Sequence, residues 1–130
     1  MKKAITILAI LLLTILSTDL IFGVEYVTDF DIATAQAKEN NENILVIFST
    51  EGCVYCDKLK SELISIDGID NYTICILDST VYKKMTLRRN IRRWPTSLII
   101  DVTSDSFKEI KRLVGYESYK AYGKWINSNQ

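Results

Sequence analysis

The hydrophobic pattern of the chain predicts an alternation of buried strands and amphipathic helices. Three largely apolar runs, rich in β-branched residues, are typical of strands covered on both faces. They span Ile44–Phe48, Tyr72–Leu77 and Thr96–Ile100. A polar turn at Asp101–Asp105 follows the third run, and Glu109–Val114 then alternates between polar and apolar residues. This alternation predicts a fourth strand that pairs antiparallel with the third.

Apolar residues at helical spacing predict four helices around these strands. Asp29 or Asp31 can cap the first helix, which is expected to end near Lys38. The order α, β, α, β, α, β, β, α favours an α/β fold with a central mixed sheet of four or five strands and helices on both faces. The other three helices are expected from Cys53 to about Ser65 with Leu59, Leu63 and Ile64 inward, from Val81 to Arg89, and from Ser118 with Tyr119, Tyr122, Trp125 and Ile126 inward.

The first 23 residues have the pattern of an export signal. Met1-Lys2-Lys3 is basic, residues 4–18 carry no charge, and Asp19 ends the uncharged run. This run is shorter than the roughly 20 residues that a spanning helix needs. We expect cleavage near Gly23, with an uncleaved N-terminal anchor as the alternative. Residues 24–130 would then form one domain in the periplasm or another extracytoplasmic compartment.

The charge of the chain argues against nucleic acid as a partner. The whole sequence has 16 basic and 16 acidic residues and no net charge. No linker rich in proline, glycine or serine divides it, and Pro95 is its only proline. Its length suits a single domain with a proper core.

The most informative motif is Cys53-Val54-Tyr55-Cys56, which follows the first predicted strand and a turn at residues 49–52. If a helix opens at Cys53, its sulfur lies where unpaired backbone N–H groups favour an anion, so that a reactive thiolate can form. The two intervening residues place the sulfur of Cys56 within disulfide reach. The motif therefore predicts a redox site.

Zinc, haem and inert thiols are the other interpretations of this motif. Zinc normally takes four Cys or His ligands, yet the chain has no histidine and only one further cysteine, Cys75. Haem attachment needs a histidine after the second cysteine, where this chain has Asp57. Neither a metal nor another cofactor is expected. A purely structural pair remains open, and Cys75, inside an apolar run, is expected to pack in the core.

From about Asp29 to Asn127 the chain resembles the thioredoxin-like superfamily. The apolar run before the cysteine motif, Trp94-Pro95-Thr96 before the third strand, and Gly115 before an amphipathic final helix carry this resemblance. It implies a thiol–disulfide oxidoreductase in which Cys53 is the nucleophile, Cys56 resolves the mixed disulfide, and the two form a redox disulfide. It also implies a cis peptide bond at Pro95, with Trp94 against the sulfurs and Trp94, Pro95 and Thr96 binding substrate.

The chain departs from thioredoxins proper beside the motif. Ile47 stands where they have a buried acid, Gly52 stands where they have tryptophan, and Val54-Tyr55 replaces Gly-Pro. Tyr55 is similar to the tyrosine before the second cysteine of disulfide isomerases. We expect a reductase or isomerase rather than an oxidant, with the direction of electron flow set by the reduction potential and by the partner that recharges the site. Glu51 could accept a proton through water, or it is a solvated loop carboxylate.

Partners follow from the resemblance and from the charge near the predicted groove. We expect exported proteins with disulfides or thiols as substrates and a membrane-bound electron donor that recharges the site. Arg92 and Arg93 close a basic run that either favours acidic partners and the Cys53 thiolate or is a solvated face. The alternative function is a non-catalytic binding module or thiol chaperone, with cysteines that serve stability only.

Overall fold

The computed structural model describes residues 23–129, and its elements follow the predicted order. Short 3₁₀ turns at Leu63–Ser65 and Ile69–Asn71 connect α3 to β2. The main elements are α2 (Phe30–Asn40), β1 (Asn43–Ser49), α3 (Val54–Glu62), β2 (Tyr72–Asp78), α4 (Lys83–Arg88), β3 (Thr96–Asp101), β4 (Lys108–Val114) and α5 (Tyr119–Asn127).

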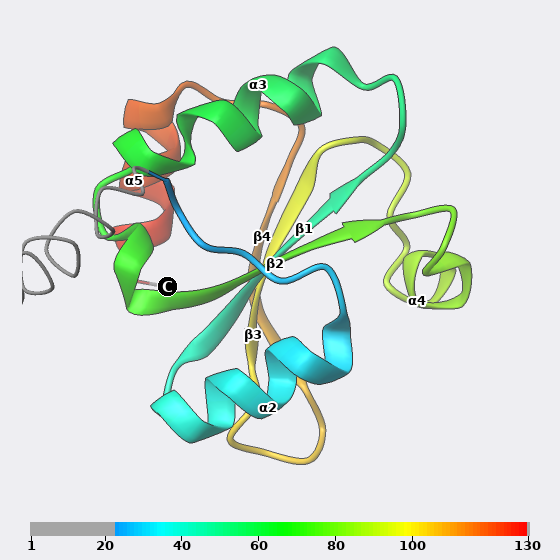
Figure 1. Cartoon of the computed structure of the whole chain (residues 1–130), viewed down its shortest axis with the longest axis vertical. Coiled ribbons are helices and arrows are strands. Elements are labelled where there is room, and N and C mark those ends of the chain that lie inside the picture. The colour runs from blue at the N-terminus through cyan, green and yellow to red at the C-terminus, as the bar shows by residue number, and fades with distance from the viewer. Residues whose placement is uncertain (1–22, 130) are drawn as a thin grey trace, which may run out of the picture.

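The four strands form one mixed sheet in the order β2-β1-β3-β4. β1 pairs parallel with β2 and antiparallel with β3, and β3 pairs antiparallel with β4. Helices α3 and α5 cover one face of this sheet, and α2 and α4 lie on the other (Figure 1). The predicted α/β architecture and the β3–β4 hairpin are confirmed.

Successive residues of β1 pack into two separate hydrophobic cores, because the side chains of a strand alternate between the two faces of the sheet. Ile44, Val46 and Phe48 pack on the side of α2. Leu45 and Ile47 pack on the side of α3 and α5. All five are buried. A strand covered on both faces must be apolar where it is buried, which is why Ile44–Phe48 carries no polar residue and the polar Asn43 and Ser49 lie at the ends of β1.

Two of the predicted helix starts are confirmed by side-chain caps. The backbone N–H of Ile32 donates to Asp29 Oδ1 over 3.0 Å at the start of α2. The N–H of Ala121 donates to Ser118 Oγ over 3.3 Å at the start of α5. Each cap satisfies one backbone donor that the first helical turn leaves free.

Helix α4 is shorter than the span Val81–Arg89 predicted for it, because a local turn delays its start. Asp78 Oδ1 accepts hydrogen bonds from the backbone N–H and the hydroxyl of Thr80, over 2.8 and 2.7 Å. These bonds hold a turn that competes with helix, and they lower the pKa of the Asp78 carboxyl. The helix begins only at Lys83.

The predicted burial of two residues, Ile64 and Tyr119, is wrong. Ile64 is exposed because the α-helix ends at Glu62 and continues as a 3₁₀ turn, whose three residues per turn bury Leu63 and turn Ile64 outward. Tyr119, in the first turn of α5, is also exposed, whereas Tyr122 and Ile126 of the same helix are buried.

No helix within residues 23–129 is long and apolar enough to cross a membrane. The predicted export signal lies outside the described residues, apart from the exposed Gly23, so it stays a prediction.

Candidate active site

The cysteine motif lies where the chain leaves β1 and enters α3. Gly52 completes the turn with a φ of 74°, a left-handed conformation that side chains other than glycine adopt reluctantly. Cys53 is the N-cap residue of α3, and its Sγ accepts a hydrogen bond from the backbone N–H of Cys56 over 3.1 Å. This geometry favours the thiolate of Cys53, because both the N–H group and the helix N-terminus attract negative charge.

The two cysteines are joined in a disulfide, yet their environments differ. Their Cα atoms are 5.2 Å apart. Cys53 is partly exposed, whereas only 3% of Cys56 is exposed. A disulfide or thiol from another molecule can therefore reach Cys53 and is shielded from Cys56.

The loop that ends at Pro95 lies at the same edge of the sheet as the cysteine motif. Phe48 of β1 pairs with Thr96 of β3. The turn that follows Phe48 and the loop that precedes Thr96 are therefore brought together. The Trp94–Pro95 peptide bond is cis. The carbonyl of Pro95 accepts a hydrogen bond from the Gly115 N–H over 2.8 Å, which ties the loop to the end of β4.

The side chain of Trp94 is directed by a residue that the sequence did not suggest. Its Nε1–H donates to Ser79 Oγ over 2.6 Å, and Ser79 in turn donates its N–H to the carbonyl of Ser49 over 2.8 Å. Trp94 and Ser79 line a cavity of about 390 Å³ together with Thr50. That Trp94 lies against the sulfurs stays a prediction. Thr96 is buried, and its hydroxyl donates a hydrogen bond to the carbonyl of Arg93 over 2.7 Å.

Tyr55 stacks on a second tyrosine that sequence reasoning missed. The ring centroids of Tyr55 and Tyr116 are 5.4 Å apart, and Tyr55 remains 58% exposed. Tyr116 donates its hydroxyl to Glu62 Oε2 over 2.7 Å, and the ammonium of Lys58 lies 5.0 Å from its ring centroid. The hydrogen bond to the Glu62 carboxylate, together with desolvation, raises the pKa of Tyr116 to about 12. In the sequence, only the position of Tyr116 directly after Gly115 could have indicated that it lies near the cysteine motif.

The predicted charged modulators are all exposed. Glu51 lines a cavity of about 630 Å³ that also holds the acids Asp57 and Asp78. Arg92 turns back on its own loop and donates from Nε to Asn90 Oδ1 over 2.9 Å. Arg93 is exposed beside it. A role for these three residues stays a prediction.

A family model for the thioredoxin-like domain matches residues 30–130. The chain belongs to the thioredoxin-like family. No curated protein sequence matches it. The match includes both halves of the site, the cysteine motif and the Pro95 loop.

Solved thioredoxins have the same fold as this thioredoxin-like chain. The thioredoxin of Thermus thermophilus has a TM-score of 0.66 at 18% identity, covering 78% of this chain and 83% of that one. A thioredoxin h of Nicotiana alata scores 0.65 at 15% identity and covers 83% and 96%. A poplar thioredoxin h scores 0.63 at 16% identity and covers 77% and 90%. The fold and the Cys53–Cys56 disulfide support thiol–disulfide oxidoreductase activity in general.

The thioredoxin-like site lacks an acid in the strand below it. Ile47 is buried in the same apolar cluster as Leu59 of α3 and Tyr122 of α5, so β1 offers no proton acceptor at this position. Within residues 23–129, no group of three or more His, Cys, Asp or Glu side chains is placed to hold a metal ion.

Cys75 lies in the core, as predicted, and we expect it to resist alkylation in the folded protein. Burial, followed by the charge of Asp29, raises the pKa of its thiol to about 12. After reduction with dithiothreitol, iodoacetamide should label Cys53 within minutes and leave Cys75 unmodified until urea unfolds the chain. Mass spectrometry of the digested protein reads each site. Labelling of Cys75 at the rate of Cys53 under native conditions would show that the thiol is accessible after all.

Proposed function

We propose that the chain is a thiol–disulfide oxidoreductase of the bacterial cell envelope that exchanges disulfides with exported proteins and acts as a reductase or isomerase. The observation that carries the proposal is the unequal burial of Cys53 and Cys56 at the N-terminus of α3. Unequal access gives the two thiols different roles in an exchange reaction.

In the first step the thiolate of Cys53 attacks one sulfur of a substrate disulfide. A mixed disulfide forms between Cys53 and that sulfur, and the other substrate sulfur leaves as a thiolate that takes a proton from solvent. The Cys56 N–H, which donates to Cys53 Sγ, and the start of α3 stabilise the attacking thiolate.

In the second step Cys56 loses its proton and attacks Cys53 Sγ. The Cys53–Cys56 disulfide forms, and the second substrate thiolate leaves, so the substrate has gained the two electrons that the enzyme has lost. Since Ile47 provides no base, the proton of Cys56 goes to water or to the leaving thiolate. A membrane-bound electron donor would return the site to its dithiol form.

Exposed apolar side chains beside the motif suit an unfolded protein client. Val54 and Tyr55, between the two cysteines, are exposed, and so is Trp94 in the Pro95 loop. Such residues can hold an extended segment of a client while its disulfide reacts. The same surface would also serve a thiol chaperone that performs no exchange, which is the alternative function.

A Cys56→Ser variant is expected to trap the mixed disulfide, because the resolving thiol is absent while Cys53 keeps its place at the helix start. Expressed with its own N-terminal segment, the variant should accumulate covalent complexes with exported proteins. These complexes appear on non-reducing gels after acid quenching, disappear with dithiothreitol, and are identified by mass spectrometry.

The matched control is Cys53→Ser with Cys56 intact, which presents only the buried thiol and should trap little. Both variants are made in a Cys75→Ser background so that no third thiol contributes. If neither variant traps any partner and loss of the gene product leaves exported disulfides unchanged, the enzyme assignment fails and the chaperone alternative takes its place.

A further inference from the structure

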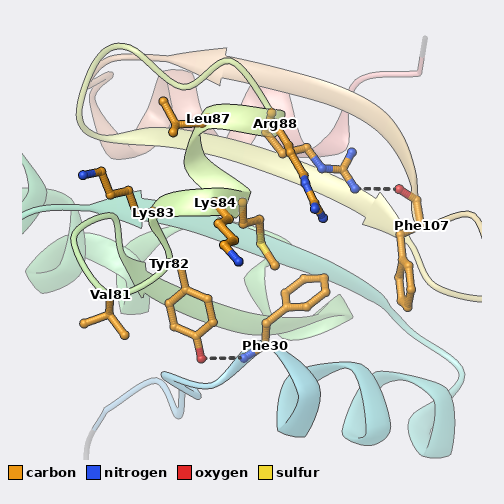
Figure 2. A pocket seen from close by; sticks show the side chains of 10 residues that line it. Phe30, Val81, Tyr82, Lys83, Lys84, Leu87, Arg88 and Phe107 are labelled. Atoms are coloured by element: carbon orange, nitrogen blue, oxygen red, sulfur yellow. Dashed lines mark hydrogen bonds between the residues drawn. The ribbon is translucent and has the colours of Figure 1, made fainter.

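A further cavity, which contains no residue of the cysteine motif, lies between α4, the start of α2 and the loop before β4 (Figure 2). Its volume is about 700 Å³, within the range of about 300–1,000 Å³ that is usual for small-molecule sites. Of the ten lining residues, six are apolar or aromatic and four are basic, and none is acidic. This composition distinguishes it from the other surface hollows, which contain acids or several hydroxyl groups.

The inner part of the cavity is apolar. Phe30, Tyr82, Met85 and Phe107 pack against the core on the α2 side of the sheet. The rings of Phe30 and Phe107 meet edge to face with centroids 5.8 Å apart. The Tyr82 hydroxyl accepts from the Phe30 N–H over 3.3 Å and lies 3.4 Å from an oxygen of Asp29, so it is already satisfied. A ligand here would contact carbon and sulfur rather than free polar groups.

The rim combines apolar side chains with positive charge. Val81 and Leu87 are 73% and 70% exposed. Lys84 and Arg88 extend from α4 toward Phe30 (Figure 2), and neither they nor Lys83 make an ion pair within residues 23–129. Exposed apolar surface of this kind marks binding sites, and unpaired cations beside it attract an anion.

The fourth cation on the rim is already used in the fold. Arg89 donates from a terminal nitrogen to the Phe107 carbonyl over 2.9 Å and lies 3.8 Å from Glu109 Oε2. It fixes the loop before β4 against α4. Phe107 also has the ammonium of Lys38 at 5.7 Å from its ring centroid. Arg89 thus holds the Phe107 loop in place, and the other three lining cations, Lys83, Lys84 and Arg88, all belong to α4.

We propose that this cavity binds a small amphipathic carboxylate, namely a single apolar chain ending in a negative head group, of the fatty-acid type. The chain lies on Phe30, Tyr82, Met85 and Phe107, and the carboxylate lies between Lys84 and Arg88. This ligand matches both halves of the cavity, since apolar burial provides most of the affinity and the two cations set the orientation. The proposal is independent of the redox chemistry of Cys53.

Other occupants fit the cavity less well. A second copy that docked through the same face would bring the same cations and so meet like charge. The segment before Gly23 carries Lys2 and Lys3 and one acid, Asp19, so its net charge is also positive. An extended peptide usually pairs with a strand edge. The lining residues come from α2, α4 and adjoining loops, and at the β2 edge Val27 already bridges to Cys75.

Met85 offers a direct reporter for the test, because the chain has only two methionines and the other is Met1. Protein labelled with ¹³C at the methionine methyl groups is titrated with sodium decanoate below its micelle concentration. The Met85 methyl signal should shift and saturate below about 1 mM. Decyltrimethylammonium, with the same chain and the opposite charge, should bind at least about tenfold more weakly.

A charge-reversed pair tests the head-group contacts. Lys84→Glu combined with Arg88→Glu should weaken decanoate binding at least about tenfold. The matched control, Lys120→Glu with Lys124→Glu on the exposed face of α5, changes the net charge equally and should bind decanoate like the wild type. Both double variants should keep the Cys53–Cys56 reduction potential of the wild type, which shows that they fold.

Four results would overturn the proposal. They are the absence of a saturable Met85 shift, equal affinity for the cationic analogue, equal loss of affinity in the α5 control pair, and binding to vesicles of anionic phospholipid without binding of monomeric decanoate. The last would instead make this face a membrane-docking surface. Because the readout is the Met85 methyl group, failure of the redox assignment would leave the result unaffected.

Discussion

Replacing Cys53 with serine is expected to lower the rate of disulfide exchange by a factor on the order of 10³ or more, to the uncatalysed level. The hydroxyl of serine stays protonated at neutral pH, so the variant has no nucleophile at the more accessible of the two cysteine positions. Cys56 cannot take over, since it is 3% exposed and lies one helical turn inside α3. The measurement is kcat/KM for reduction of insulin disulfides, with dithiothreitol as the electron source.

The matched control for Cys53→Ser is Cys75→Ser, which also removes one thiol and leaves the motif intact. Cys75 lies in the middle of β2, opposite Val46, and does not take part in the proposed exchange. Its variant should keep exchange within about twofold of the wild type while losing some stability, because a hydroxyl replaces sulfur in an apolar core. Residual exchange in Cys53→Ser above the level of dithiothreitol alone would contradict the assignment of the nucleophile.

The sequence indicated both segments of the candidate site, because each has a strong local signal. A thiol pair two residues apart and a sole proline before an apolar strand are features of the chain itself. The parallel and antiparallel partners of β1 then bring the segments to one edge of the sheet. The contacts between side chains at that edge were not predictable. Trp94 binds Ser79 and Tyr55 stacks on Tyr116, and these partners lie 15 and 61 residues apart in the sequence.

The strands were predicted more accurately than the ends of the helices, for a physical reason. A strand buried on both faces must be apolar along its length, so its pattern leaves few alternatives. Helix ends depend on competing local hydrogen bonds and on changes of helical period. Asp78 and Thr80 form such bonds and delay α4, and the 3₁₀ turn after Glu62 moves Ile64 from the inner to the outer face.

Tyr122→Ala is expected to lower the free energy of unfolding by about 3–5 kcal/mol, the range for removing a large aromatic side chain from a core. Tyr122 is fully buried in α5 and meets the Trp125 ring edge to face at 5.2 Å. It packs in the same cluster as Leu45 and Ile47, so its loss leaves a cavity between α5 and the sheet. Urea denaturation followed by circular dichroism measures the change. A loss below about 1 kcal/mol would mean that α5 does not close this core.

The hydroxyl of Tyr122 contributes separately, and Tyr122→Phe isolates it. Burial raises the pKa of Tyr122, so the hydroxyl stays protonated and donates to the buried Ser97 Oγ over 2.7 Å. Tyr122→Phe and Ser97→Ala should each cost about 1–3 kcal/mol, because each leaves a buried polar group without its partner. The double variant leaves neither group stranded, so it should cost clearly less than the sum of the two. Additive losses would show that the two hydroxyls are not coupled, and that α5 is held to β3 by apolar packing alone.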